Sequence, residues 1–249
     1  MERLEGRVAV VTGAASGLGL AVTEAFVDAG LRVVMADIDE TSLHAHAARL
    51  IDAGGAVHPV VVDVRDPTAV EAAGAAALEH FGGLNVAVNN AGIVNGGPAW
   101  ELTLEEWHRV LDVDLWGVIH GVRAFVPLIL ASGDEGHVVN VASMAAVSAV
   151  GRIAPYTVAK HGVLGLSDVL RADLHTIGAP VGVSVVMPGM IKTGMNPIGT
   201  VSAATVAANI VDAMRRGRDY VFTDDHHAEA VEARLRAILA ARHDVLPEP

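Results

Sequence analysis

The stretch Arg7-Val-Ala-Val-Val-Thr-Gly-Ala-Ala-Ser-Gly-Leu-Gly19 decides the fold of this chain. Its first six residues are mostly apolar or β-branched, which is typical of a buried parallel strand, and a helical pattern follows from Leu18 to Ala29. The glycines between them permit a tight turn and let the backbone approach a pyrophosphate at the helix N-terminus, where free N–H groups and the helix dipole favour anions. A glycine-rich turn alone is weak evidence, but strand, turn and helix together predict dinucleotide binding. The residues expected to contact the dinucleotide here are Gly13, Ser16, Gly17, Leu18 and Gly19.

The next predicted strand, 32–37, ends in an acidic residue, Asp37. It lies about twenty residues beyond Gly17, where a carboxylate accepts hydrogen bonds from the adenosine ribose hydroxyls. A carboxylate there would repel a 2′-phosphate, so NAD is favoured over NADP. In the alternative interpretation, Asp37 or Asp39 merely caps the helix that begins near Glu40. Asp39 suits the cap better, which leaves Asp37 for the ribose.

The rest of the chain continues to alternate between strand and helix patterns. Further strands are predicted at 57–62, 84–90, 136–143, 181–187 and 219–223, and helices at 40–52, 67–81, 103–130, 155–177, 202–216 and 226–242. This alternation predicts a doubly wound α/β fold, a Rossmann-like parallel sheet with helices on both faces. Because the chain contains no linker or repeat, we expect residues 1–249 to form a single domain.

Polar and small residues gather where these strands end, at the sheet edge that binds ligands in such folds. After the third strand, Asp63 and Val64 are expected to meet the adenine, whereas Asp66-Pro67 starts a helix. After the fourth come two asparagines, whose amides can satisfy exposed strand backbone groups. The candidate cofactor contacts in this second segment are Asn89, Ala91 and Gly92.

The chain holds only two tyrosines and two lysines, and one of each forms the motif Tyr156-Thr-Val-Ala-Lys160. Positions i and i+4 share one helix face, so the Lys160 ammonium can lie beside the Tyr156 phenol and favour its ionised form. Ser143 lies thirteen residues before the tyrosine, at the end of the fifth strand. The pair predicts a proton-transfer catalyst. An isolated pair of this kind is more often part of an ordinary surface helix.

The composition excludes several classes of function. A formal net charge of −12 argues against a nucleic-acid partner, which needs a basic footprint. The chain has no cysteine, so it cannot form disulfides or thiolate zinc sites. It shows no signal-peptide core and no apolar run of about 20 residues, so we expect a cytoplasmic location and no membrane partner. Asp224-Asp-His-His227 is interpreted as a helix start, and no metal site is predicted.

Together these motifs resemble the short-chain dehydrogenase/reductase family, in its compact single-domain branch, over about residues 5–195. The resemblance rests on the glycine turn, Asp63-Val64, Asn89-Asn-Ala-Gly92, Ser143, Tyr156-x-x-x-Lys160 and Pro188-Gly-x-Ile191-x-Thr193. It implies hydride transfer with a nicotinamide cofactor. Tyr156 would be the general acid/base, Ser143 would orient the substrate oxygen, and Lys160 would bind the nicotinamide ribose. Further cofactor contacts are implied at Pro188, Gly189, Ile191 and Thr193.

The chain departs from the family pattern in two places. Where the family usually has an asparagine linked through water to the active-site lysine, this chain has Asp114. Asp114 can accept a bond from water or Lys160 and would raise the lysine pKa, which predicts either a working relay with altered pH dependence or a loss of activity. The substrate lid is short, near 194–201, so the pocket is open or completed by another subunit. The usual closing strand is replaced by the atypical segment 219–242, and residues 246–249 are expected to fray.

The leading hypothesis is an NAD(H)-dependent oxidoreductase that interconverts a secondary alcohol and a ketone on a hydrophobic or alicyclic small molecule. The apolar segments Met144–Val150 and Met187–Ile191 suggest that substrate. An alternative is a weakly active or inactive dinucleotide-binding sensor or scaffold, which Asp114 keeps open. Epimerisation or dehydration is a further alternative that the short chain disfavours. The resemblance implies a homodimer or homotetramer.

Overall fold

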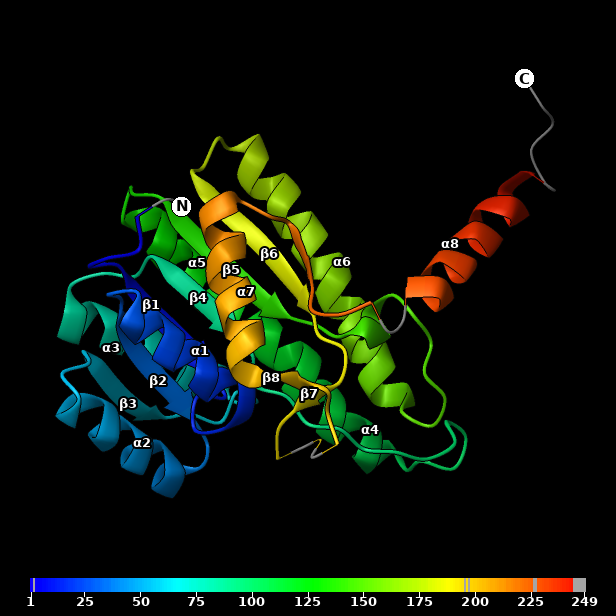
Figure 1. The fold of residues 1–249 in the computed structure, drawn as a ribbon, viewed down its shortest axis with the longest axis horizontal. Coiled ribbons are helices and arrows are strands. Elements are labelled where there is room, and N and C mark those ends of the chain that lie inside the picture. Colours follow the sequence, from blue (N-terminus) through cyan, green and yellow to red (C-terminus); the bar gives the residue numbers. More distant parts are fainter. Residues whose placement is uncertain (2, 195, 197, 226–227, 244–249) are drawn as a thin grey trace.

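The computed structural model describes the chain except for residues 2, 195, 197, 226–227 and 244–249. Within the described residues, seven parallel strands form one sheet in the order β3-β2-β1-β4-β5-β6-β9 (Figure 1). They are β1 (Val8–Thr12), β2 (Arg32–Asp37), β3 (Val57–Val61), β4 (Val86–Asn89), β5 (Gly136–Val141), β6 (Val181–Met187) and β9 (Tyr220–Phe222). The predicted doubly wound α/β fold is confirmed.

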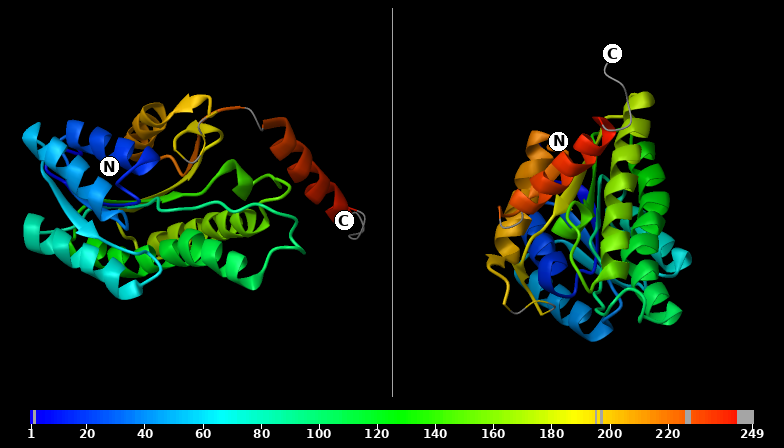
Figure 2. Two further views of the ribbon diagram at one scale, coloured as in Figure 1. Left: turned by 90° about the horizontal axis from the view of Figure 1, so that it is seen from below. Right: turned by 90° about the vertical axis from the view of Figure 1, so that its right-hand side faces the viewer.

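Helices cover both faces of the sheet (Figure 2). One layer is α1 (Gly17–Asp28), α2 (Glu40–Asp52) and α7 (Ala203–Arg216), and the other is α3 (Pro67–Phe81), α5 (Gly117–Ala131) and α6 (Ala154–Thr176). Because successive side chains along a strand point to opposite faces of the sheet, β1 contributes apolar side chains to both helix layers. Ala9 and Val11 pack with the first layer, and Val8 and Val10 with the second.

Strands β3, β4, β5 and β9 end one or two residues earlier than predicted, and for β4 and β5 a polar side chain explains the end. Asn90 leaves the β4 ladder because its N–H donates to Thr12 Oγ1 at 2.9 Å. Strand β5 ends at Val141, so that Ser143 instead caps a short 3-10 turn, Met144–Ala146. Both ends lie at the carboxyl edge of the sheet, where the chain turns outward.

The helix predicted at 103–130 contains an irregular turn. Its start is confirmed, because Thr103 Oγ1 accepts from the Glu106 N–H at 3.2 Å while Glu106 Oε2 accepts from the Thr103 N–H at 2.8 Å. Helix α4 (Leu104–Leu111) then passes through a π-turn, Asp112–Trp116, into α5. The sequence pattern did not predict this turn, which carries Asp114.

The continuous helix Leu104–Ala131 is long and apolar enough to cross a membrane by length and composition. Its α5 part instead packs into the protein core. Phe125 and Ile129 are fully buried against the sheet and α3, and Val118 is buried with residues of β6 and α6. We therefore describe it as a core helix.

The C-terminal part differs most from the expectation. Strands β7 (Ile191–Lys192) and β8 (Val201–Ser202) form a small second sheet that was not predicted. Ser202 caps α7 through a bond from the Thr205 N–H at 3.0 Å, so the predicted helix start at 202 is corrected by one residue. The last helix, α8 (Ala228–His243), leads away from the body (Figures 1 and 2). Its predicted beginning near 226 and the tail 246–249 lie outside the described residues.

Candidate active site

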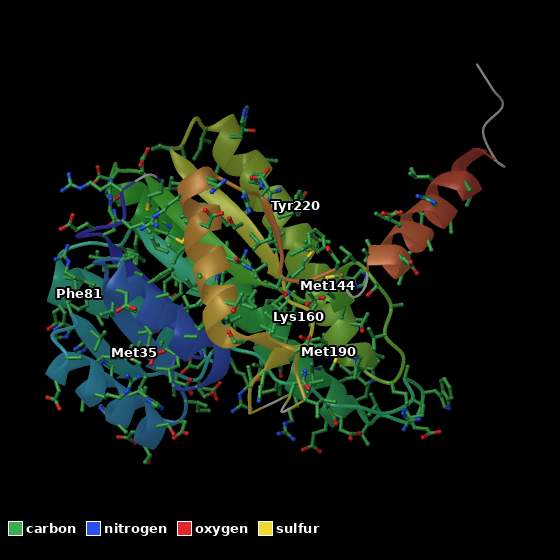
Figure 3. All side chains as sticks on the ribbon, viewed as in Figure 1. Met35, Phe81, Met144, Lys160, Met190 and Tyr220 are labelled. Carbon is green, nitrogen blue, oxygen red and sulfur yellow. The ribbon has the colours of Figure 1, made fainter. Side chains whose placement is uncertain are left out.

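A cleft of about 920 Å³ opens at the carboxyl ends of the central strands. It brings together segments from most of the chain, including Lys160 of α6 (Figure 3). The predicted site residues that line it are Gly13, Ser16, Gly17, Leu18, Asp37, Asp63, Val64, Ala91, Gly92, Asp114, Ser143, Tyr156, Lys160, Pro188, Gly189, Ile191 and Thr193. Gly19 and Asn89 do not line it.

The glycine turn forms a cradle that side chains would fill. Gly13 has φ +68°, and a Cβ there would lie 2.8 Å from Asn90 Nδ2. Gly17 has φ +53° at the first residue of α1, and a Cβ on Gly19 would overlap the Gly13 carbonyl oxygen. Gly19 therefore lies behind the turn, where there is no room for a side chain, and does not face the cleft. An open backbone at a helix N-terminus fits a dinucleotide pyrophosphate.

Asp37 is fixed at the end of β2 by backbone groups. Its Oδ2 accepts from the Ala15 N–H at 2.8 Å, and its Oδ1 accepts from the Asp39 N–H at 2.9 Å. Asp39 is the helix cap, because its Oδ1 accepts from the Ser42 N–H at 3.1 Å. The choice of Asp39 over Asp37 as the N-cap of α2 is thus confirmed. Each Asp37 oxygen keeps accepting capacity toward the cleft.

The neighbouring Asp63 is held by a cation that we did not predict. Arg65 Nε donates to both Asp63 oxygens at 2.9 Å, and Arg65 Nη2 pairs with Asp63 Oδ2. The hydrogen bond from Arg65 holds the pKa of Asp63 below its usual range. Both side chains line the cleft, so Asp63 presents a neutralised pair there, whereas Asp37 remains a carboxylate without a cation partner among the described residues.

Asn89, which the sequence suggested as a cofactor contact, does not line the cleft. Asn89 is buried behind the cleft, and its Nδ2 donates to Asn140 Oδ1 at 2.8 Å. The side chain that faces the cleft is Asn90, whose Nδ2 donates to the Thr12 carbonyl at 2.9 Å. The two asparagines have opposite orientations because successive side chains of a strand point to opposite sides.

Ser143, Tyr156 and Lys160 come from two elements and meet in the cleft. Ser143 Oγ accepts from the Ala145 N–H at 3.1 Å, which leaves its hydroxyl proton free to donate. Tyr156 lies in the first turn of α6, and Lys160 Nζ is 5.4 Å from the centre of its ring. Lys160 Nζ also donates to the Val141 carbonyl at 3.1 Å.

A buried ion pair lies behind the tyrosine. Lys160 Nζ is 3.1 Å from Asp114 Oδ2, and their side chains are 4% and 0% exposed. Asp114 Oδ1 accepts from the Ile93 N–H at 2.8 Å. Gly92 makes room for the pair, since a Cβ there would lie 3.1 Å from Asp114 Oδ2 and 3.5 Å from Lys160 Nζ. Asp114 therefore binds the lysine directly.

The electrostatics of the pair follow from burial and from mutual attraction. Burial alone would lower the pKa of Lys160, but the Asp114 carboxylate and Tyr156 outweigh it, so the pKa of Lys160 is raised. Burial raises the pKa of Asp114, against the pull of Lys160 and the Ile93 N–H. The predicted direction for the lysine is confirmed, and its ammonium persists at neutral pH.

Several cleft residues were missed by sequence reasoning. Arg65, Asn90 and Arg109 line the cleft. Arg65 follows Asp63 by two residues, and their spacing at a strand end was a usable signal. Arg109 lies on α4, and nothing in its local pattern distinguishes it from an ordinary exposed helix residue. No group of metal-ligating side chains occurs among the residues that the structure describes.

The sheet topology, the glycine cradle at the start of α1 and the Tyr156–Lys160 pair beside Ser143 define a dinucleotide-dependent oxidoreductase of the Rossmann class. Residues 7–199 match the family model for short chain dehydrogenases. The chain therefore belongs to the short-chain dehydrogenase/reductase family. It is a dehydrogenase that acts on CH–OH groups and binds a nicotinamide cofactor.

Similar proteins agree with this assignment. A short-chain dehydrogenase/reductase from Burkholderia phymatum, solved in complex with NAD, matches at 32% identity and a TM-score of 0.95, with 100% of both chains covered. The apo form of LigO from Sphingobium sp. strain SYK-6 matches at 31% identity and a TM-score of 0.91, over 100% of this chain and 93% of that one. The 1-deoxy-11-beta-hydroxypentalenate dehydrogenase of Streptomyces exfoliatus is 40% identical over 245 residues, 94% of this chain and 86% of that protein.

Proposed function

We propose that this protein is an NAD(H)-dependent oxidoreductase that interconverts a secondary alcohol and a ketone by hydride transfer, with Tyr156 as the general acid/base. The observation that carries the proposal is the meeting of Ser143, Tyr156 and Lys160 in the same cleft as the glycine cradle. The cofactor supplies the chemistry of accepting or donating the hydride. The chain supplies positioning and the proton.

In the oxidation direction, the substrate carbon loses a hydride and the substrate hydroxyl loses a proton to the Tyr156 phenolate. Ser143 donates its free hydroxyl proton as a hydrogen bond to the substrate oxygen. Lys160 stabilises the phenolate electrostatically and would hold the nicotinamide ribose when the cofactor is bound. In the reverse direction, Tyr156 returns the proton to the oxygen. General acid/base groups of this kind contribute about 10²–10⁴-fold to rate.

Asp114 keeps the lysine charged in this scheme. The direct contact of 3.1 Å supports a role in holding the Lys160 ammonium beside the phenol. The carboxylate also accepts the Ile93 N–H, so one side chain ties the lysine to the loop after β4. This arrangement favours a working site with altered pH dependence over an inactive sensor or scaffold.

The substrate proposal rests on the lining of the cleft and on a relative. Apolar side chains that line the cleft include Ile93, Val94, Ala142, Pro188 and Ile191. Met144 and Met187, which the sequence suggested as pocket residues, are buried in the core instead. The name of the Streptomyces relative specifies a hydroxypentalenate substrate for that protein, which supports a hydrophobic, alicyclic secondary alcohol here. We further propose a single domain, a homodimer or homotetramer and a cytoplasmic location.

Turnover tests the proposal through matched tyrosine variants. Nicotinamide absorbance is followed with alicyclic secondary alcohols and ketones. Tyr156→Phe should lower kcat by about 10²–10⁴-fold while the thermal shift with NAD persists. Tyr220→Phe is the control, because it removes the other phenol, which donates to Asp168 Oδ1 outside the cleft. Full turnover by Tyr156→Phe would contradict the mechanism.

Cofactor preference tests Asp37. Thermal shifts should be larger with NAD than with NADP, because the carboxylate repels a 2′-phosphate. Asp37→Ala should reduce that preference at least tenfold, whereas Asp39→Ala, which removes a carboxylate serving only as the cap of α2, should lower thermal stability and keep the preference. A wild-type preference for NADP would contradict the role of Asp37.

A further inference from the structure

The final helix, α8, is attached to the substrate side of the cleft and then leaves the protein. Val231 packs beside Met144 and Val147 in the cluster next to Ser143, and Arg234 Nη1 donates to the Val147 carbonyl at 3.0 Å. Beyond Arg234, no side-chain hydrogen bond or ion pair joins the described part of α8 to another element. Figures 1 and 2 show the helix extending beyond the body.

The outer part of α8 carries an unpartnered apolar surface. Leu235, Ile238 and Leu239 are 48%, 56% and 60% exposed. They follow the spacing of one helix face. A helix of this length is marginal in water without packing, so the surface needs a cover. The same stretch carries Arg236, whose guanidinium pairs with Glu232 one turn earlier on the helix at 2.9 Å.

A complementary surface lies on the loop that leads into α4, at the same end of the molecule as α8 (Figure 1). Trp100 and Leu104 are 85% and 77% exposed. Two exposed carboxylates, Glu101 and Glu105, flank them. The loop is held in place, since the Gly97 N–H donates to the Arg152 carbonyl at 2.7 Å. The apolar side chains there match those of α8, and the two carboxylates match the Arg236 guanidinium.

We propose that α8 of one subunit docks on the Trp100–Leu104 loop of a second copy of this chain, and that the contact is reciprocal. Two such contacts related by a two-fold axis close into a dimer. Leu235, Ile238 and Leu239 cover Trp100 and Leu104, and Arg236 faces Glu101 and Glu105. Because the same loop begins at the cleft residues Ile93 and Val94, the partner's helix forms a wall at the mouth of the cleft, where the lid is short.

The absence of cysteine allows a direct test by crosslinking. Four double variants place a cysteine at 100 or 104 and another at 235 or 239 of the full-length chain. Under mild oxidation, at least one pair, such as Trp100→Cys with Leu239→Cys, should give covalent dimers that reduction separates. Each single variant should stay a monomer on a denaturing gel. Trp100→Cys with Ile51→Cys, exposed on α2, is the matched control and should not crosslink.

Charge reversal tests whether the contact is specific. Arg236→Glu should reduce the crosslinked fraction severalfold, and adding Glu105→Arg should restore it, because the opposite charges then face each other again. Three results overturn the proposal: no crosslink in any of the four pairs, a disulfide only within one chain, or dimers from Leu239→Cys alone, which indicate pairing of α8 with α8. These readouts need no turnover, so they fail or succeed separately from the proposed reaction.

Discussion

At the scale of single residues, the buried contact between Lys160 and Asp114 sets the chemistry of the site. Of the ion pairs among the described residues, this one alone is fully withdrawn from water. Taking two charges out of water costs several kcal/mol for each charge. Their mutual attraction offsets this cost only if the remaining polar atoms are hydrogen-bonded. The Ile93 N–H satisfies Asp114 Oδ1 and the Val141 carbonyl accepts from Lys160, whereas Asp114 Oδ2 has, among the described residues, only its ion pair with Lys160. The pair is therefore sensitive to removal of either partner.

Asp114→Asn should lower the free energy of unfolding at pH 7. It should also lower activity at high pH. Leaving Lys160 without its counter-ion costs about 3–5 kcal/mol of unfolding free energy, measured by urea unfolding at pH 7. The wild-type pKa of Lys160 is raised, so its stabilisation is present below the unfolded value of about 10.4 and is lost as pH rises through the folded value. In the variant the contribution of Asp114 is gone and only Tyr156 opposes the effect of burial, so the lysine pKa falls below its wild-type value. The alkaline limb of kcat/KM should therefore shift to lower pH.

The control for this variant is Asp112→Asn, two residues away, whose carboxylate forms no ion pair within 4 Å among the described residues. It changes the same charge and should leave both the unfolding free energy and the pH profile of kcat/KM close to those of the wild type. If the alkaline limb of Asp114→Asn coincides with the wild-type limb, Asp114 is not coupled to the proton transfer.

Gly92→Ala should disturb the same pair from the other side. The added Cβ would lie 3.1 Å from Asp114 Oδ2 and 3.5 Å from Lys160 Nζ, so the charges must separate slightly. Overpacking of this kind costs about 1–3 kcal/mol. Gly165→Ala is the control, because the exposed Gly165 in α6 has no atom within 4 Å of a new Cβ, and it should gain about 0.5–1 kcal/mol. Equal melting temperatures for both variants would contradict the crowding.

At the scale of elements, the Asp112–Trp116 π-turn places Asp114 where a regular helix would not. The extra residue in the turn separates α4 from α5 and aims one carboxylate at α6. Such π-turns often occur at functional sites. The position and orientation of α4 therefore affect the geometry of the site. Helix α4 also contributes Arg109 to the lining of the cleft.

Thr103→Ala should destabilise α4 in particular. It removes the side-chain half of the capping box with Glu106 and should lower the unfolding free energy by about 1 kcal/mol. Faster hydrogen exchange of the N–H groups in the first turn of α4 locates the effect. Thr41→Ala, an exposed residue in the first turn of α2, should change stability by less than about 0.5 kcal/mol. Unchanged exchange at Glu106 in Thr103→Ala would argue against the cap.

At the scale of the whole molecule, a buried histidine links three strands of the sheet. His137 of β5 contacts Ser184 Oγ of β6 at 2.8 Å, and Ser184 Oγ donates to the Arg218 carbonyl just before β9 at 2.6 Å. Because the serine proton goes to Arg218, His137 donates from Nε2. Burial lowers the pKa of His137 to about 3, so the ring is neutral in the folded protein.

The free energy of unfolding should fall in acid because of His137. A histidine whose folded pKa is depressed contributes stability above its unfolded value of about 6.5, and this is lost as pH falls toward about 3. The expected loss is about 1.4 kcal/mol per pH unit in that window, measured by urea unfolding. His137→Leu with Ser184→Ala removes donor and acceptor together and should flatten the slope between pH 6 and 4. A slope identical to that of the wild type would show that other groups cause the acid sensitivity.

Local patterns determined much of this protein from sequence. The glycine turn, the Thr103 capping box and the strand–helix alternation are properties of neighbouring residues, so the parallel sheet, its helix layers and most helix bounds could be predicted, whereas the order of the strands came from the structure. The spacing of Tyr156 and Lys160 works in the same way, because i and i+4 must share a helix face. The motifs then located the carboxyl edge of the sheet as the site.

Tertiary structure alone decided the remaining features, because they depend on segments far apart in the chain. Which of Asn89 and Asn90 faces the cleft follows from the exact end of β4 against β1 and β5. The direct Asp114–Lys160 contact needs an irregular turn that no residue pattern announced. The direction of α8 depends on where Val231 packs. A sequence states which groups are available, but the sum of packing and desolvation over the whole fold decides which of them meet.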